Sequence, residues 1–354
     1  MIFKHESLRR VGRAIFGAAG SEGEEPGLVT DHLVDANLAG HDSHGVRHIP
    51  GYVGAARDGR AKLNRHAKLV KDSGTILVLE GDCGFGQVIG RETMALGIER
   101  VRETGLCMIA LRNSYHLGRI GAWAEMCSGA GFASVHFVNI LGSPPVVAPF
   151  GGAEARMAPN PVSASVPTTR GAPIVLDIAT SKIAEGKVGV ALSRGVGVPE
   201  GSLIDAHGNP TTDPGALYTK PPGAILPMGE HKGFGLCVIS ELLAGAVGGG
   251  GTLQPRSHNK NEVNNMLSFI VDPAAIGEVD LLRSEIDGFV AWVKASPPAR
   301  GAKEVLMPGE MEWRTRQKRA ADGIPIDDKT WEQILEIADV VGLKGDDVSR
   351  MASS

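Results

Sequence analysis

Residues 75–111 read TILVLEGDCGFGQVIGRETMALGIERVRETGLCMIAL, which is two apolar runs separated by a glycine-rich turn and a longer, mixed segment. The short apolar runs at 75–80 and 107–111 predict strands. The segment 91–104 between them predicts a helix. This strand, helix, strand order indicates an α/β protein.

The glycine turn in this segment, Gly-Phe-Gly-Gln-Val-Ile-Gly at 84–90, follows a predicted strand and precedes a predicted helix. Its spacing is Gly-x-Gly-x-x-x-Gly, and no acidic residue stands at a strand end about twenty residues farther on. The turn therefore lacks the fingerprint of a Rossmann dinucleotide-binding domain.

The rest of the chain continues the mixed pattern. Further strands are predicted at 132–139, 161–168 and 174–178, and further helices at 7–19, 28–39, 118–129, 181–193, 278–295 and 328–341. Ser181 is placed to cap the helix that it begins. The stretch 233–251 carries Glu241 and several glycines, so we interpret it as a packed internal helix that runs into a glycine loop. Both ends of the chain are helical and its centre is rich in strands. We therefore expect a helical domain built from residues 1–70 and 296–354 around a central α/β domain at 71–295.

Composition narrows the class of protein. The 354 residues, 42% of them hydrophobic, can bury a large core. The 36 Lys and Arg against 40 Asp and Glu give a formal net charge of -4, which predicts neither a nucleic-acid nor a membrane partner. The four cysteines form no Cys-x-x-Cys pair and predict buried thiols in a reducing compartment. The N-terminal residues lack the pattern of a secretion signal, so we expect a cytoplasmic protein.

Two glycine-flanked turns carry histidine. Residues 40–45 read Gly-His-Asp-Ser-His-Gly, and residues 113–118 read Asn-Ser-Tyr-His-Leu-Gly. The ordinary pKa of histidine lies near neutrality, so two such turns predict proton transfer to or from a substrate. We expect His44 to move the proton, Ser43 to be a hydrogen-bond partner, and Arg47 to hold a substrate carboxylate.

Asp177 closes an apolar predicted strand in the run Leu-Asp-Ile-Ala-Thr-Ser at 176–181. A carboxylate in that position either caps the helix that follows or lies buried in a site. In the second case it is a candidate to accept a hydrogen bond from His44 and so orient the imidazole.

Other chemistry remains open for these turns. On a continuous helix His41, His44 and His48 would share one face, as zinc ligands do, and this would suit a metal-dependent lyase or hydrolase. Two glycines and Pro50 interrupt such a helix, and no His-Glu-x-x-His pattern accompanies it, so we expect no metal site. A nucleotide sensor without activity would need only the glycine turns, such as the one before Lys232.

Eight short motifs follow one another along the chain, at 40–45, 84–87, 113–118, 149–152, 160–161, 176–181 with 186–187, 210–214 and 231–233. In this order they resemble the type-2 malate/L-lactate dehydrogenase family, which also contains sulfolactate, ureidoglycolate and diketogulonate oxidoreductases. The similarity runs from about residue 5 to about residue 345. Segments such as 118–121, 289–297 and 323–325 look closest to its bacterial hydroxycarboxylate dehydrogenase branch.

The resemblance implies a homodimeric enzyme that transfers a hydride between NAD or NADP, with NAD slightly favoured, and a 2-oxoacid or 2-hydroxyacid. It also implies a non-Rossmann cofactor domain with a mixed, largely antiparallel sheet flanked by helices, beside a discontinuous helical domain. By position, His44 and His116 match the family's two histidine turns, and Asp177 matches an acidic site residue. Cofactor contacts would then fall on His44, Gly118, Arg119, Ile120, Leu176, Asp177, Ile178, Ala179, Thr180, His231, Lys232, Asn265, Gly309, Glu310, Met311 and Glu312.

The chain departs from the family pattern in the substrate pocket. Many members carry arginine four residues after the first site histidine, whereas here that residue is His48 and the arginine is Arg47. The usual Gly-Thr-Asn-Pro reads Ala-Pro-Asn-Pro at 158–161, and a lysine that some members use is absent at 139–140. We therefore expect Arg47 and His48 to bind the substrate. A reductase of cyclic imines such as piperideine or pyrroline carboxylate stays an alternative.

Overall fold

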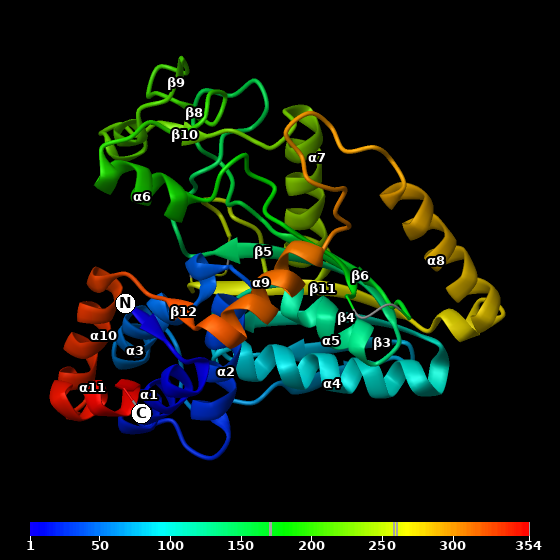
Figure 1. Cartoon of the computed structure of the whole chain (residues 1–354), viewed down its shortest axis with the longest axis horizontal. Coiled ribbons are helices and arrows are strands. Elements are labelled where there is room, and N and C mark those ends of the chain that lie inside the picture. Colours follow the sequence, from blue (N-terminus) through cyan, green and yellow to red (C-terminus); the bar gives the residue numbers. More distant parts are fainter. Residues whose placement is uncertain (170–171, 258, 260, 354) are drawn as a thin grey trace.

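The computed structural model describes residues 1–169, 172–257, 259 and 261–353. Its centre is a seven-stranded sheet in the order β2-β3-β4-β11-β5-β6-β7 (Figure 1). The strands are β2 (Lys68–Asp72), β3 (Ile76–Glu80), β4 (Leu106–Ser114), β11 (Val263–Val271), β5 (Ala133–Leu141), β6 (Val162–Val166) and β7 (Ile174–Ile178). The neighbours β3 and β4 are parallel and the other pairs are antiparallel, which confirms the predicted mixed, largely antiparallel sheet.

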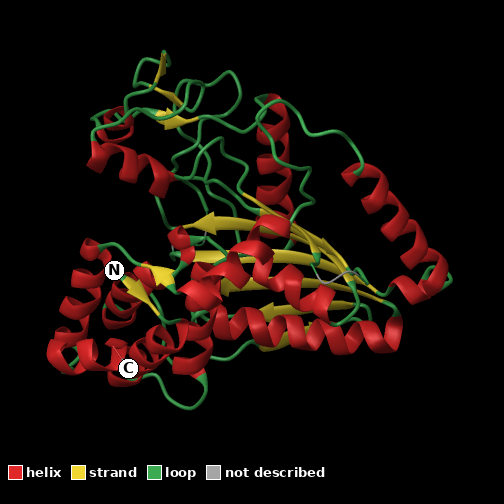
Figure 2. Cartoon of the chain, viewed as in Figure 1, coloured by secondary structure: helices red, strands yellow, loops and turns green. Residues whose placement is uncertain are grey.

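Helices cover both faces of this sheet (Figure 2). On one face, α4 (Gly86–Thr104) and α5 (Gly121–Gly129) share a core with alternate residues of the strands, such as Leu77 and Leu79. On the other face, Val78 packs with Leu243 of the π-helical segment η4 (Glu241–Val247), which continues α7 (His231–Ser240). Successive side chains of β3 point to opposite faces of the sheet and so pack in two separate cores.

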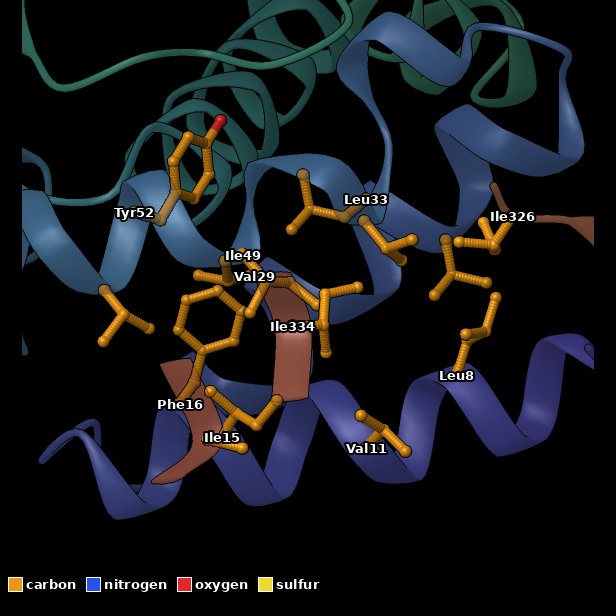
Figure 3. Packing of buried hydrophobic residues seen from close by; sticks show 14 of the residues in the cluster. Leu8, Val11, Ile15, Phe16, Val29, Leu33, Ile49, Tyr52, Ile326 and Ile334 are labelled. Atoms are coloured by element: carbon orange, nitrogen blue, oxygen red, sulfur yellow. The ribbon is translucent and has the colours of Figure 1, made fainter. Parts of the chain in front are cut away.

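A group of helices from both chain ends stands beside the sheet. It contains α1 (His5–Ala18), α2 (Glu25–Leu38), α3 (Ile49–Arg57), α10 (Asp328–Val340) and α11 (Gly345–Ser353). The short strands β1 (Ile2–Phe3) and β12 (Ile324–Pro325) pair within it. Figure 3 shows Ile334 among the side chains of the N-terminal helices, such as Ile15 and Phe16, in one buried cluster. This confirms the predicted discontinuous helical part.

The remaining elements surround these two parts. A small lobe contains α6 (Glu185–Arg194), β8 (Leu203–Ile204), β9 (Pro210–Thr211), η3 (Pro214–Tyr218) and β10 (Ala224–Ile225). The turn η5 (Pro273–Ala275) leads to α8 (Val279–Lys294), which lies at the far end of the sheet in Figure 1, and α9 (Glu310–Asp322) contacts α2. The predicted division at 70/71 falls inside β2, and the one at 295/296 follows α8. The domain bounds stay a prediction.

The sequence did not predict the central strand, β11. Its polar side chains Asn264, Asn265 and Ser268 are buried and hydrogen-bonded to neighbouring strands or loops, so it lacks the apolar pattern of a buried strand. Strand β2 was missed as well, because all five of its residues are exposed. Both strands owe their place to pairing with neighbours rather than to their own composition.

Other expectations fail locally. The predicted Ser181 cap is wrong, because α6 begins at Glu185 after Ala184 and the Ser181 hydroxyl donates to the Ile183 carbonyl. Helix α4 begins at Gly86, five residues before the predicted start at 91. The segment α7–η4 is a helix that runs into a glycine loop, as predicted. It is not a buried internal helix, because the side chain of Val247 is 65% exposed.

The two-ended core makes a stability prediction. Replacing Ile334 by alanine should lower the free energy of unfolding by about 2–5 kcal/mol, because its side chain is fully buried in the cluster shared by α1, α2 and α10. The control is Val340→Ala on the same helix, where the side chain is 50% exposed and the expected change is about 0.5 kcal/mol. Urea unfolding of both variants measures the difference. Equal losses would contradict the assigned core.

Candidate active site

The first histidine turn folds as two short 3-10 turns, η1 (Asp42–His44) and η2 (Val46–His48), that lead directly into α3. The side chain of Asn37 on α2 holds both turns. Its amide donates to Asp42 at 2.7 Å, and its oxygen accepts the Val46 N–H at 2.8 Å. Gly45 is required here, because a Cβ at this position would lie 2.1 Å from the Asn37 oxygen. Gly45, which argued against a continuous helix in the sequence, is therefore required for this turn.

The second histidine turn leaves β4 and is held from two sides. The Leu117 N–H donates to the Asn264 side chain at 2.9 Å, and the Arg119 N–H donates to His32 Nε2 at 2.9 Å. Gly118 has a φ of +71°, and a Cβ there would lie 2.3 Å from His32 Nε2. Burial lowers the pKa of His32 to about 3, which keeps Nε2 available as an acceptor.

The two turns meet in a cluster of three imidazoles. The ring centroid of His116 lies 5.9 Å from that of His44, in a stacked arrangement, and 5.2 Å from that of His48. Ser43 Oγ lies 2.9 Å from His44 Nδ1. His48 Nε2 donates to the Ser43 carbonyl at 2.8 Å. Residues predicted from two separate motifs are thus brought together.

Tyr52, which sequence reasoning missed, anchors this cluster. Its hydroxyl accepts a hydrogen bond from Gln87 Nε2 at 3.0 Å and lies 2.6 Å from His116 Nδ1. Because the hydroxyl already accepts from Gln87, it can donate its own proton to Nδ1, which places the proton of a neutral His116 on Nε2. A tyrosine at helical spacing in an apolar run has no sequence signal that separates this role from core packing.

Burial and mutual repulsion keep these imidazoles uncharged. Burial first, and then the neighbouring histidines, lowers the pKa of His44 to about 3. Burial likewise lowers the pKa of His48 to about 4, against the hydrogen bond to Ser43, and holds the pKa of His116 well below its ordinary value. All three rings are therefore neutral at pH 7.

Metal binding finds no support in this geometry. His41 lies 3.3 Å from Glu312 and so faces away from the set that the sequence allowed with His44 and His48. In the described part of the chain, no group of three His, Cys, Asp or Glu side chains is arranged to hold a metal ion.

Two hollows flank the histidine cluster. A small cavity of about 270 Å³ is lined by His48 and His116 together with Tyr52, Tyr115, Arg60 and Glu262. A large cleft of about 640 Å³ lies between the first histidine turn, α6 and α9. Ser43 lines the cleft and His116 lines the cavity, and His44 contacts both of these residues. The two predicted substrate-binding residues are separated, because His48 faces the cavity and Arg47 faces the cleft.

More cations than acids line the large cleft. Arg47, Lys187 and Arg194 line it, and none of them forms an ion pair with a residue that the structure describes. The acids in the same walls already have partners. Asp42 pairs with Arg319 and Glu312 with His41, while Asp327 caps α10 and is also attracted by the charge of Arg47. The cleft therefore suits an anionic ligand.

Comparisons with known proteins agree with this arrangement. Residues 3–335 match the family model for malate/L-lactate dehydrogenase. Hydroxycarboxylate dehydrogenase B of Escherichia coli K12 is 44% identical, covering 96% of this chain and 94% of that protein. L-lactate dehydrogenase of Cupriavidus necator is 41% identical over 94% of this chain and 95% of its own. The solved structure of sulfolactate dehydrogenase from Methanocaldococcus jannaschii is 33% identical with a TM-score of 0.87, over 98% of this chain and 99% of that one.

The chain belongs to the malate/L-lactate dehydrogenase family. This confirms the family predicted from the motif order. Members of a dehydrogenase family use a nicotinamide cofactor. The described helices contain none that is long and apolar enough to cross a membrane.

Several residues that the family resemblance assigned to the cofactor meet beside the large cleft. Arg119, on the second histidine turn, lies 2.5 Å from Glu125 and 3.5 Å from Asp177. Its Nη1 atom is buried and makes no hydrogen bond with the described residues. Asp177 is buried, which raises the pKa of its carboxyl against the opposing effect of Arg119. The expectation that Asp177 orients His44 is wrong in this structure, since His44 Nδ1 bonds to Ser43 and Asp177 faces Arg119.

The other residues assigned to the cofactor are spread around this cluster. Gly309 and Glu310 directly follow Pro308, whose carbonyl accepts a hydrogen bond from Val175 N–H of β7. Glu310 forms a 2.6 Å ion pair with Lys294. Lys232 stands in the first turn of α7, after His231. Met311 and Glu312 line the cleft. Asn265 is not brought to it, because its amide is fully buried between Asn113 and Asn139.

A nicotinamide dinucleotide fits these surroundings. Arg47, Lys187 and Arg194 in the cleft could bind an anionic pyrophosphate. The buried Arg119 Nη1, which forms a 3.5 Å ion pair with Asp177 but no hydrogen bond with the described residues, could donate to a neighbouring polar group. Ile178 ends β7, and Ala179 and Thr180 follow it; the Thr180 hydroxyl already donates to the Asn160 carbonyl.

The depressed histidine pKa values predict a pH-dependent stability. In the unfolded chain these rings titrate near 6.5, whereas folding lowers the pKa to about 3 for His44 and about 4 for His48. The unfolded state therefore binds protons first as the pH falls, so the free energy of unfolding decreases from about pH 6.5 to about pH 4. Each histidine contributes about 1.4 kcal/mol per pH unit. Above about pH 7 these groups contribute no slope.

Urea unfolding between pH 7.5 and 4.5 measures this effect. His44→Gln and His48→Gln should each reduce the slope by about one histidine's share, while the exposed His207→Gln serves as the control. A slope that neither site substitution changes would contradict the assigned protonation state.

Proposed function

We propose that this protein is an NAD(P)-dependent oxidoreductase that interconverts 2-oxoacids and 2-hydroxyacids by hydride transfer, with histidine as the acid/base. The single observation that carries the proposal is the position of the stacked His44 and His116 between a cation-lined cleft and a small cavity. The names of the relatives, which include hydroxycarboxylate and L-lactate dehydrogenases, support the same reaction class.

The cleft would hold the cofactor and the cavity the substrate. Arg47, Lys187 and Arg194 would neutralise the pyrophosphate, and Arg119 and Asp177 would bind a neighbouring polar group. When bound, the cofactor supplies C4 of its nicotinamide as the hydride donor or acceptor. The charges in the cleft do not separate NAD from NADP, and NAD stays the favoured expectation of the sequence.

The protein groups handle the proton. His116 carries its proton on Nε2 and can donate a hydrogen bond to the substrate oxygen, since Tyr52 occupies Nδ1. In the oxidative direction, neutral His44 accepts the hydroxyl proton. In the reductive direction, His44 must first gain a proton, and the negative charge of a bound substrate carboxylate favours that imidazolium. His44 then gives its proton to the forming alkoxide.

The expected homodimer and cytoplasmic location are part of this proposal. The exposed apolar side chains of the α7–η4 segment, such as Ile239 and Val247, support a subunit interface there. A small-molecule substrate agrees with the size of the cavity.

Replacing His44 by alanine tests the acid/base assignment. Turnover should fall by about 10²–10⁴-fold, while the dissociation constant of NADH or NADPH changes little, because the imidazole moves the proton and does not hold the pyrophosphate. Steady-state kinetics and a fluorescence titration measure the two quantities, with the exposed His207→Ala as the matched control. Near-normal turnover of His44→Ala would remove this residue from the mechanism.

A scan of NADH and NADPH oxidation tests the reaction class and the cofactor together. The substrates are pyruvate, oxaloacetate, 2-oxoglutarate, phenylpyruvate and piperideine carboxylate. We expect oxidation with at least one open-chain 2-oxoacid. Reaction with the cyclic imine alone would establish an imine reductase instead, and cofactor binding without any oxidation would indicate a sensor.

A further inference from the structure

The small cavity has a charged outer end that the histidine chemistry does not use. Arg60, just beyond the end of α3, donates from Nη1 to Glu262 at 2.6 Å, and both residues line the cavity together with His48 and His116. The pair joins segments 202 positions apart in the chain. Gly142 allows this closure, because a Cβ at its φ of +81° would lie 2.5 Å from Glu262 Cα.

A substrate carboxylate in this cavity needs a cation. His48 stands where many family members carry arginine, but its ring is neutral and its Nε2 already donates to Ser43. Arg47 lines the other hollow. Among the described residues that line the small cavity, Arg60 is the one with a permanent positive charge.

We propose that Arg60 binds the carboxylate of the 2-oxoacid or 2-hydroxyacid and that Glu262 occupies this guanidinium when the substrate is absent. The proposal rests on the function proposed above. Substrate binding is then an exchange of the Glu262 carboxylate for the substrate carboxylate on Nη1 of Arg60, while Nη2 donates to Asp58 at 3.2 Å. Glu262, whose side chain is already 38% exposed, moves into solvent at little cost.

The polar, apolar and charged residues that line the cavity match the groups of a 2-oxoacid. His116 and Tyr52 form its polar inner wall, Ile140 and Val263 are apolar, and Arg60 marks the charged end. A 2-oxoacid can therefore direct its carbonyl oxygen to His116 and its carboxylate to Arg60.

Kinetics of the two partners of this ion pair test the proposal, because their substitutions have opposite expected effects. Arg60→Gln should raise KM for the 2-oxoacid by about 10- to 100-fold with kcat little changed, and Arg60→Lys should recover part of the loss. Glu262→Gln should lower KM by about 3- to 10-fold, since it removes the competing carboxylate. Arg60→Gln also loses the pair with Asp58, but both ion pairs are exposed, so the thermal stabilities of the two glutamine variants should be similar.

Two controls make the outcome decisive. Arg65→Gln removes an exposed arginine that pairs with Asp82 outside the cavity and should leave KM unchanged. Arg47→Gln tests the alternative anchor. Parallel changes of KM in Arg60→Gln and Glu262→Gln, or a rise in KM only in Arg47→Gln, would overturn the assignment to Arg60 while the proposed reaction stands. A wild-type enzyme that turns over no 2-oxoacid would overturn the proposed function and this inference together.

Discussion

The hydrogen bond between the Tyr52 hydroxyl and His116 Nδ1 joins the two halves of the molecule. Tyr52 lies on α3, in the core shared by the two chain ends, and His116 follows β4 of the central sheet. At 2.6 Å this contact fixes both the orientation and the proton of the imidazole. The helical part therefore positions one side of the candidate site and the sheet positions the other. A shift between them would separate His116 from His44, because each ring is carried by a different part of the fold.

Crowding of imidazoles determines the chemistry that this arrangement can perform. Three rings whose neighbouring centroids lie within about 6 Å of one another, in a buried setting, cannot all carry charge. They rest in the neutral form, and a negative charge placed beside them would favour an imidazolium. In the proposed function the cofactor and the substrate are both anions, so the surrounding cations would bind them and the histidines would remain free for the proton. This division of labour agrees with a dehydrogenase whose cofactor carries the redox chemistry.

Much of this could be predicted from local sequence. Apolar spacing and glycine punctuation located α1, α2, β3 and β7, and the two histidine turns predicted the imidazoles that the fold brings together. The features that the sequence did not predict depend on contacts between residues far apart in the chain. Strand β11 is central but polar, because its asparagines bond to neighbouring strands and loops. The roles of Tyr52 and Arg60 come from contacts made across the fold, with His116 and Glu262, which no spacing rule reveals.

The most direct test of the central claim is a crystal structure of the protein with NADH and oxamate, an unreactive analogue of pyruvate. The account predicts the nicotinamide ring at the boundary between the large cleft and the small cavity, with its C4 facing oxamate and with the imidazoles of His44 and His116 beside the oxamate carbonyl oxygen. A nicotinamide ring bound away from both histidine turns would contradict it.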